Sequence, residues 1–233
     1  MSTTASFSDR LRAACRPDWE RLHEHPFVRG LADATLPPEA FRFYVEQNLE
    51  YLPEYARAMA LGASRADDLG TMRVFASELA NIADIEIPQN EELLRRVIEL
   101  GARDRGGSDG LAPATLAYTS FLVATAARGG PLEIMAAILP CTWSYGEIGS
   151  RLVGHVVQHP VYPEWIHFFG SSAYARVVET MRRDFEERTA ECDERTQERL
   201  AFLFAVSTRL ECDFWDMAYR LEHWPDVRAR YPL

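Results

Sequence analysis

Apolar residues spaced three and four positions apart over long stretches constrain the fold of this chain more than any other feature. The clearest stretch follows Ala40 and carries its apolar or aromatic side chains at Phe41, Tyr44, Val45, Tyr51, Leu52, Tyr55 and Met59. This spacing puts them on one face of an α-helix, whereas a half-buried strand would alternate every second residue. We find no alternating segment of useful length in the 233 residues. The pattern therefore predicts an all-α protein.

Glycine and proline residues divide the chain into helical segments. The predicted segments are 7–22, 40 to about 59, 66–100, 114–127, 131–157, 164–169, 170–189 and 194–222, with a non-helical break at 25–30 after the first. Pro53 is expected to kink its segment, and Pro17 and Pro88 to interrupt theirs, because proline lacks the N–H that a helix interior needs. No repeat or interdomain linker is visible. We expect one helical domain over residues 1–233, with its core at about 7–224.

Charge and composition exclude several classes of function. The net charge is −10, from 25 basic and 35 acidic residues, and no basic cluster offers the patch that nucleic acid requires. No apolar run approaches the length of a membrane helix, and the N-terminus does not read as a signal peptide. The four cysteines lie at wide, irregular spacing, which favours free thiols in a reducing cytoplasm. We therefore expect a cytoplasmic protein without a nucleic-acid or membrane partner.

The stretch Leu139–Glu147 carries the strongest chemical signal. Cys141 directly follows Pro140 inside an apolar and aromatic helical pattern. Tyr145 lies four residues later, so the thiol and the phenol share a helix face. A buried cysteine usually serves only to pack, but a proline in a helix frees a backbone carbonyl and opens the local groove. Cys141 is therefore a candidate nucleophile beside a pocket for a flat ring.

Two further polar residues lie on apolar helix faces. Glu211 is surrounded in sequence by aromatic and small residues, so its carboxyl group is expected to be buried, with a raised pKa, and to transfer protons near neutral pH. Asn48 and Tyr51 are three residues apart on the helix containing Pro53. An amide beside aromatic rings suits the edge of a heterocycle, because it offers a donor and an acceptor. A surface asparagine beside core tyrosines explains that pair equally well.

A metal site is the competing interpretation of the many acidic residues. Di-iron helical bundles pair glutamate and histidine as Glu-x-x-His on long helices. Two matches occur, at Glu20 and His23 and at Glu164 and His167. The first lies at the end of a helix and the second in a short segment, so we expect no metal site.

Several short motifs, in a specific order and spacing along nearly the whole chain, resemble the TenA family, the thiaminase II enzymes of thiamin salvage. They are His25-Pro26-Phe27-Val28-x-Gly30, Leu36-Pro37-x-x-x-Phe41-x-x-Tyr44-Val45-x-Gln47, Leu139-Pro140-Cys141-x-Trp143-x-Tyr145-x-Glu147-x-Gly149, His159-Pro160-x-Tyr162-x-x-Trp165-Ile166 and Phe214-Trp215-x-Met217-Ala218-Tyr219. The resemblance implies a heme-oxygenase-like helical bundle without heme or another cofactor, assembled as a homo-oligomer, usually a tetramer.

The resemblance also implies an activity. Family members hydrolyse 4-amino-5-aminomethyl-2-methylpyrimidine to the hydroxymethyl compound, and often act on thiamin. Cys141 matches the cysteine that attacks the pyrimidine ring, and Glu211 matches the glutamate that handles its protons. The matching substrate-binding positions are Asn48, Tyr51, Tyr118, Tyr145 and Phe169.

Asn48 departs from the family pattern, which has an aspartate there. An asparagine can still pair with an aminopyrimidine edge, but it cannot carry a proton. Phe169 falls where a tyrosine is often found. Two interpretations therefore stay open: a pyrimidine hydrolase, and a pyrimidine- or thiamin-binding protein that has lost turnover or changed its substrate.

Overall fold

The computed structural model describes residues 5–107, 110–155 and 157–224, and this part of the chain is helical and contains no strand. The all-α prediction is confirmed. The helices are α1 (Phe7–Ala14), α2 (Arg16–His23), α3 (Pro26–Ala32), α4 (Pro38–Arg65), α5 (Leu69–Asn81), the π-helical turn η1 (Ile82–Glu86), α6 (Ile87–Glu99), α7 (Pro113–Arg128), α8 (Pro131–Leu152), α9 (Tyr162–Phe169), α10 (Ser172–Thr189) and α11 (Glu194–Arg220).

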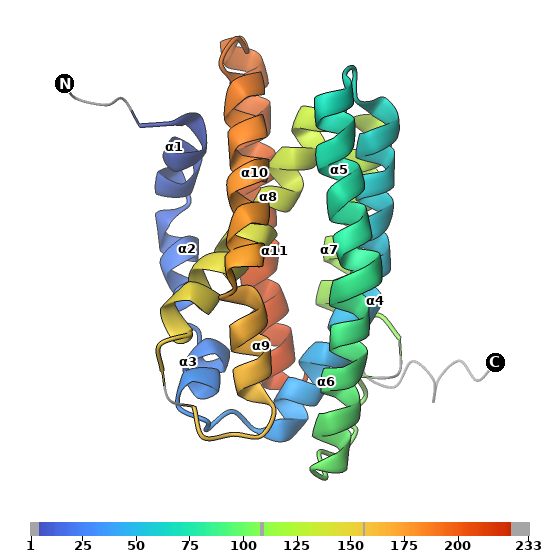
Figure 1. Cartoon of the computed structure of the whole chain (residues 1–233), viewed down its shortest axis with the longest axis vertical. Coiled ribbons are helices and arrows are strands. Elements are labelled where there is room, and N and C mark those ends of the chain that lie inside the picture. Colours follow the sequence, from blue (N-terminus) through green and yellow to red (C-terminus); the bar gives the residue numbers. More distant parts are fainter. Residues whose placement is uncertain (1–4, 108–109, 156, 225–233) are drawn as a thin grey trace.

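The long helices form a bundle (Figure 1). Helix α4 packs against α5, α6 and α7, while α8 packs against α10 and α11. Contacts of α4 with α8 and α11 join these two groups. The short helices α1, α2 and α3 lie along one side of the bundle, next to α10 and α11 (Figure 1). The centre of the molecule is therefore enclosed by helices from both groups.

The N-terminal region confirms the interruption predicted near Pro17 but differs at the break predicted for 25–30. The helix is interrupted at Cys15, and Pro17 lies in the first turn of α2, where its missing N–H costs nothing. The segment at 25–30, expected to be non-helical, instead begins α3. There His25 caps the helix, since its Nδ1 accepts a hydrogen bond from the backbone N–H of Phe27 at 3.1 Å, and Pro26 occupies the first turn.

The prolines inside the long helices have different effects. Helix α4 continues through Pro53 and α8 through Pro140. At Pro88 the expected interruption is instead the π-helical turn η1, which comes just before the proline. There the N–H of Ile87 donates to the carbonyl of Ile82, five residues back, and Pro88 has no N–H to continue the α-helical ladder. Helix α8 ends at Leu152 rather than at the predicted residue 157.

A cluster of stacked rings fills the core. The ring centroids of Tyr44 and Trp215 are 5.3 Å apart, and those of Tyr145 and Trp215 are 5.1 Å apart. Trp165 Nε1 donates to Tyr44 Oη at 3.1 Å. These contacts join α4, α8, α9 and α11 in the centre of the bundle.

Candidate active site

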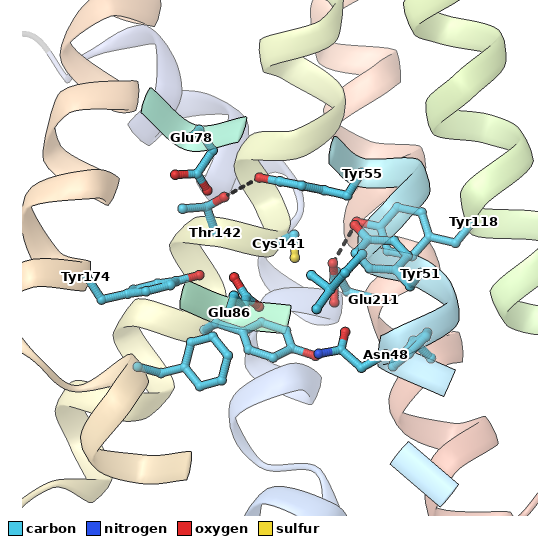
Figure 2. Close-up of a pocket in the computed structure, with 14 residues that line it drawn as sticks. Asn48, Tyr51, Tyr55, Glu78, Glu86, Tyr118, Cys141, Thr142, Tyr174 and Glu211 are labelled. Carbon is cyan, nitrogen blue, oxygen red and sulfur yellow. Dashed lines mark hydrogen bonds between the residues drawn. The ribbon is translucent and has the colours of Figure 1, made fainter. Parts of the chain in front are cut away.

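A cavity enclosed by side chains of several helices lies in the middle of the bundle. Figure 2 shows the side chains pointing into it from separate helices. The lining residues are Asn48, Tyr51, Leu52, Tyr55, Glu78, Glu86, Tyr118, Cys141, Thr142, Tyr145, Phe169, Tyr174, Glu211 and Phe214. All seven residues that the sequence analysis assigned to a site therefore line one cavity. Their chemical roles stay predictions.

Helical spacing explains how so many side chains reach one space. Helix α4 contributes residues 48, 51, 52 and 55, which form one stripe along its inner face. On α8 the same rule brings Cys141 and Tyr145 to the cavity, as their spacing predicted. Helices α7, α9 and α11 add Tyr118, Phe169 and Glu211. The site depends on contacts between helices far apart in sequence.

Cys141 is held as a neutral thiol. Burial raises its pKa well above the ordinary value, and the negative charges of Glu211 and Glu86 raise it further. A thiolate at this position therefore requires a base that removes the proton as the sulfur reacts. Figure 2 shows Glu211 next to the thiol, on the neighbouring helix α11.

Glu211 is buried, with 2% of its surface exposed. Burial raises its pKa to about 7, although hydrogen bonds from Tyr118 and Cys141 act in the opposite direction. Tyr118 Oη lies 2.6 Å from Glu211 Oε1 and 2.9 Å from Ser207 Oγ. Ser207 in turn donates to the carbonyl of Ala137 at 2.6 Å. A carboxyl group with a pKa near neutrality can both accept and return a proton.

The amide of Asn48 has a fixed orientation. Its Nδ2 donates to Asn90 Oδ1 at 3.1 Å, and Asn90 Nδ2 donates to the carbonyl of Glu86 at 2.8 Å. Because the backbone carbonyl can only accept, Asn90 must present its oxygen to Asn48. Among the described residues, Asn48 Oδ1 and the second N–H of its amide have no hydrogen-bond partner. The amide can therefore accept from an exocyclic amine and donate to a ring nitrogen.

Seven of the lining residues were not predicted from the sequence. These are Leu52, Tyr55, Glu78, Glu86, Thr142, Tyr174 and Phe214. Glu78 and Glu86 are among the acidic residues for which a metal site is the competing interpretation. A signal for them existed, because the buried positions of α5, η1 and α6 follow one helical stripe: Phe75, Glu78, Ile82, Glu86, Asn90, Leu93 and Val97. Three polar residues on such a stripe indicate a buried polar site.

The residues of the two Glu-x-x-His matches lie elsewhere. His23 Nε2 contacts Glu147 Oε2 at 3.0 Å, and His167 is exposed on α9. Within the described ranges, no group of three or more histidine, cysteine, aspartate or glutamate side chains could hold a metal ion. All four cysteines are free, as the sequence indicated. None of the described helices is both long enough and apolar enough to span a membrane.

The fold and the cavity define a helical bundle with a half-buried cysteine and a buried glutamate at its centre. The sequence matches the TENA/THI-4/PQQC family over residues 12–221. A curated relative, the aminopyrimidine aminohydrolase of Halalkalibacterium halodurans, is 35% identical over 221 residues, which cover 94% of this chain and 98% of the relative. The chain therefore belongs to the TENA/THI-4/PQQC family, as its motifs suggested.

Solved structures agree with this assignment. The TenA homologue from P. horikoshii OT3 has a TM-score of 0.81 at 29% identity and covers 93% of this chain and 99% of its own. A domain with a heme oxygenase-like fold from Shewanella denitrificans has a TM-score of 0.70 at 15% identity, covering 94% of each chain, and shows the fold alone. The heme-oxygenase-like bundle is confirmed.

Proposed function

We propose that this protein is a hydrolase of thiamin salvage that converts 4-amino-5-aminomethyl-2-methylpyrimidine to its hydroxymethyl analogue. The observation that carries the proposal is the meeting of Cys141 and Glu211 in one buried cavity, with Asn48 presenting a donor and an acceptor to it. Aromatic rings from α4, α7 and α8 line the same space and suit a flat heterocycle. The named relative, an aminopyrimidine aminohydrolase, supports the same reaction.

The first half of the reaction adds sulfur to the ring. Glu211, with a pKa of about 7, takes the thiol proton as Cys141 Sγ bonds to the ring carbon next to the one carrying the aminomethyl group. The electron pair displaced from the ring settles on a ring nitrogen, which takes the former thiol proton from Glu211. Return of that pair then breaks the bond between the methylene carbon and the amine, and the amine takes the proton of the ring nitrogen and leaves as ammonia.

The second half restores the ring. Water adds to the exposed methylene carbon and gives a proton to the Glu211 carboxylate. The carbon–sulfur bond then breaks, its electron pair returns to Cys141 Sγ, and Glu211 gives its proton to the sulfur to restore the thiol. The sum is water plus the aminomethyl compound giving the hydroxymethyl compound plus ammonia. One carboxyl group thus serves as base and acid in turn.

The test is incubation of the purified protein with the aminomethyl-pyrimidine, and separately with thiamin, followed by chromatography of the products. Hydroxymethyl-pyrimidine is expected from the wild type and none from Cys141→Ser. Cys15→Ser, at another free cysteine, is the matched control and should keep the activity. Binding of both pyrimidines without any product from the wild type would instead favour the alternative, a binding protein without turnover.

A further inference from the structure

Two carboxyl groups in the cavity have no part in the hydrolysis described above. Glu78 on α5 and Glu86 on η1 are 5% and 9% exposed, and both line the cavity. In the part of the chain that the structure describes, neither side chain has a hydrogen-bond or ion-pair partner. Two arginines, Arg73 and Arg176, line a surface groove that Glu78 also borders, yet neither pairs with it. The two acids are therefore buried without a counter-charge.

Two buried acids without a counter-charge lower the stability of the unliganded protein. Burial raises the pKa of Glu78 to about 7. Burial and the nearby charge of Glu78 together raise the pKa of Glu86 to about 8. A buried carboxylate destabilises a fold unless a cation or hydrogen-bond donors accompany it. A ligand that brought a positive charge would remove this cost.

A third polar group, from a different helix, faces the same place. Tyr174 on α10 is 7% exposed and lines the cavity. Its hydroxyl group has no hydrogen-bond partner among the described residues, so it is available to a ligand in the cavity. Figure 2 shows this hydroxyl and both carboxyl groups on the same side of Cys141, away from Tyr118. The tyrosine is evidence for a ligand that does not depend on the acids.

We propose that Glu78, Glu86 and Tyr174 form a subsite for a primary ammonium group carried by the substrate. This inference rests on the proposed function and assigns the ammonium to the aminomethyl substituent of the pyrimidine. An ammonium has three N–H donors, which match two carboxylates and one hydroxyl oxygen. The thiazolium nitrogen of thiamin has no N–H, so the subsite favours the aminomethyl compound over thiamin. A protonated amine also leaves as ammonia without needing a further proton.

The test compares an amine with its neutral analogue. Cys141→Ser protein, in which turnover is blocked, is titrated by calorimetry with the aminomethyl-pyrimidine and with the hydroxymethyl-pyrimidine. Glu78→Gln and Glu86→Gln are then introduced one at a time. Asp84→Asn is the matched control, because Asp84 lies in the same π-helical turn as Glu86 but is exposed.

The glutamate variants are expected to weaken binding of the amine selectively. Each glutamate variant should weaken binding of the amine by about 10-fold or more, as for loss of a charged hydrogen bond, and change binding of the hydroxymethyl compound by less than about threefold. Asp84→Asn should change neither. The melting temperature of unliganded Glu86→Gln should equal or exceed that of its parent, since an unpaired buried acid is removed.

Two outcomes would overturn the inference. Only the second would also overturn the proposed function. If both pyrimidines bind and the glutamate variants weaken them equally or not at all, the ammonium subsite is wrong and the proposed function stands. If neither pyrimidine binds the Cys141→Ser protein and the wild type releases no product, the proposed function fails and the subsite fails with it.

Discussion

Tyr118 on α7 holds Glu211 on α11, with 2.6 Å between the phenol oxygen and Glu211 Oε1. The same phenol contacts Ser207, and Ser207 contacts the carbonyl of Ala137, so three contacts lie in a row. The two hydroxyl groups supply only two protons for these three contacts. With Glu211 protonated a third proton is present, and every contact becomes a hydrogen bond. The single proton of Tyr118 can go to Glu211 or to Ser207, so Ser207 competes with the Glu211 carboxylate for this donor.

Opposite shifts of the pH–rate profile are expected from two variants in this row. Ser207→Ala should move the limb belonging to Glu211 to lower pH, because Tyr118 then donates to the carboxylate without competition. Tyr118→Phe should move it to higher pH, because the ionised carboxylate loses a donor. The measurement is kcat/KM for the aminomethyl-pyrimidine from about pH 5 to 9. Shifts in the same direction would contradict this proton arrangement.

Removing the carboxyl group of Glu211 should slow the reaction far more than removing either hydroxyl group. Glu211→Gln keeps the shape of the side chain but cannot exchange a proton, so kcat is expected to fall by a factor of about 10² to 10⁴. Single-turnover kinetics would separate this loss from weaker binding. Glu198→Gln, at an exposed position of the same helix, is the control and should behave as the wild type. A normal kcat for Glu211→Gln would rule out its proposed role.

The hydrogen bond between Asn48 and Asn90 makes Asn48→Asp unfavourable despite the aspartate of the family pattern. A carboxylate at position 48 would face Asn90 Oδ1, and Asn90 cannot turn because its Nδ2 is bonded to the carbonyl of Glu86. Binding of the hydroxymethyl-pyrimidine should weaken by about five- to 100-fold, the usual cost of an unmatched buried polar group. Calorimetry would measure this, with Asn90→Ala expected to weaken binding for the same reason. Tighter binding by Asn48→Asp would show that Asn90 does not fix the amide.

Glu147 is expected to contribute to stability in a pH-dependent way. Burial alone would raise its pKa, but hydrogen bonds from His23 and Trp19 and the charge of Arg12 lower it to about 2. A depressed carboxyl pKa stabilises the folded state above the ordinary value of 4.5, and this contribution is lost as the pH falls towards about 2. Glu147→Gln should lower the free energy of unfolding by on the order of 2 kcal/mol at neutral pH.

Urea unfolding at several pH values would check this prediction. The difference between Glu147→Gln and the wild type should shrink between about pH 4.5 and 2. Glu50→Gln, at an exposed position, should change little at any pH. A difference that stays constant with pH would mean that Glu147 acts through packing and not through its charge.

Gly149 determines how closely α8 approaches α9. A Cβ atom there would lie 2.4 Å from Gly170 N and 2.4 Å from the carbonyl carbon of Phe169, both of them backbone atoms. Gly149→Ala should therefore destabilise the protein by about 1–3 kcal/mol and displace Phe169 from the cavity. Thermal unfolding measures the first effect and pyrimidine affinity the second. Gly154→Ala, where a Cβ meets nothing within 4 Å, is the control.

The sequence by itself determined the helical class and the inward face of each main helix. Spacing of three and four is a local property, so it already predicted that Cys141 and Tyr145 point the same way and that Glu211 is buried. The resemblance to the family added Tyr118 and Phe169 to the five site residues that the helical pattern had already indicated. Local spacing also misled in places, since the proline at position 26, which looked like a break, instead starts α3.

Only the tertiary structure decided how the site is completed. Glu86 reaches the cavity from the π-helical turn η1, just before Pro88, and Tyr174 reaches it from α10. The orientation of Asn48 and the protonation of Glu211 depend on partners 42 and 93 residues away in sequence, Asn90 and Tyr118. Hydrogen bonds and desolvation act over a few ångströms, and only helix packing brings such distant groups within that range.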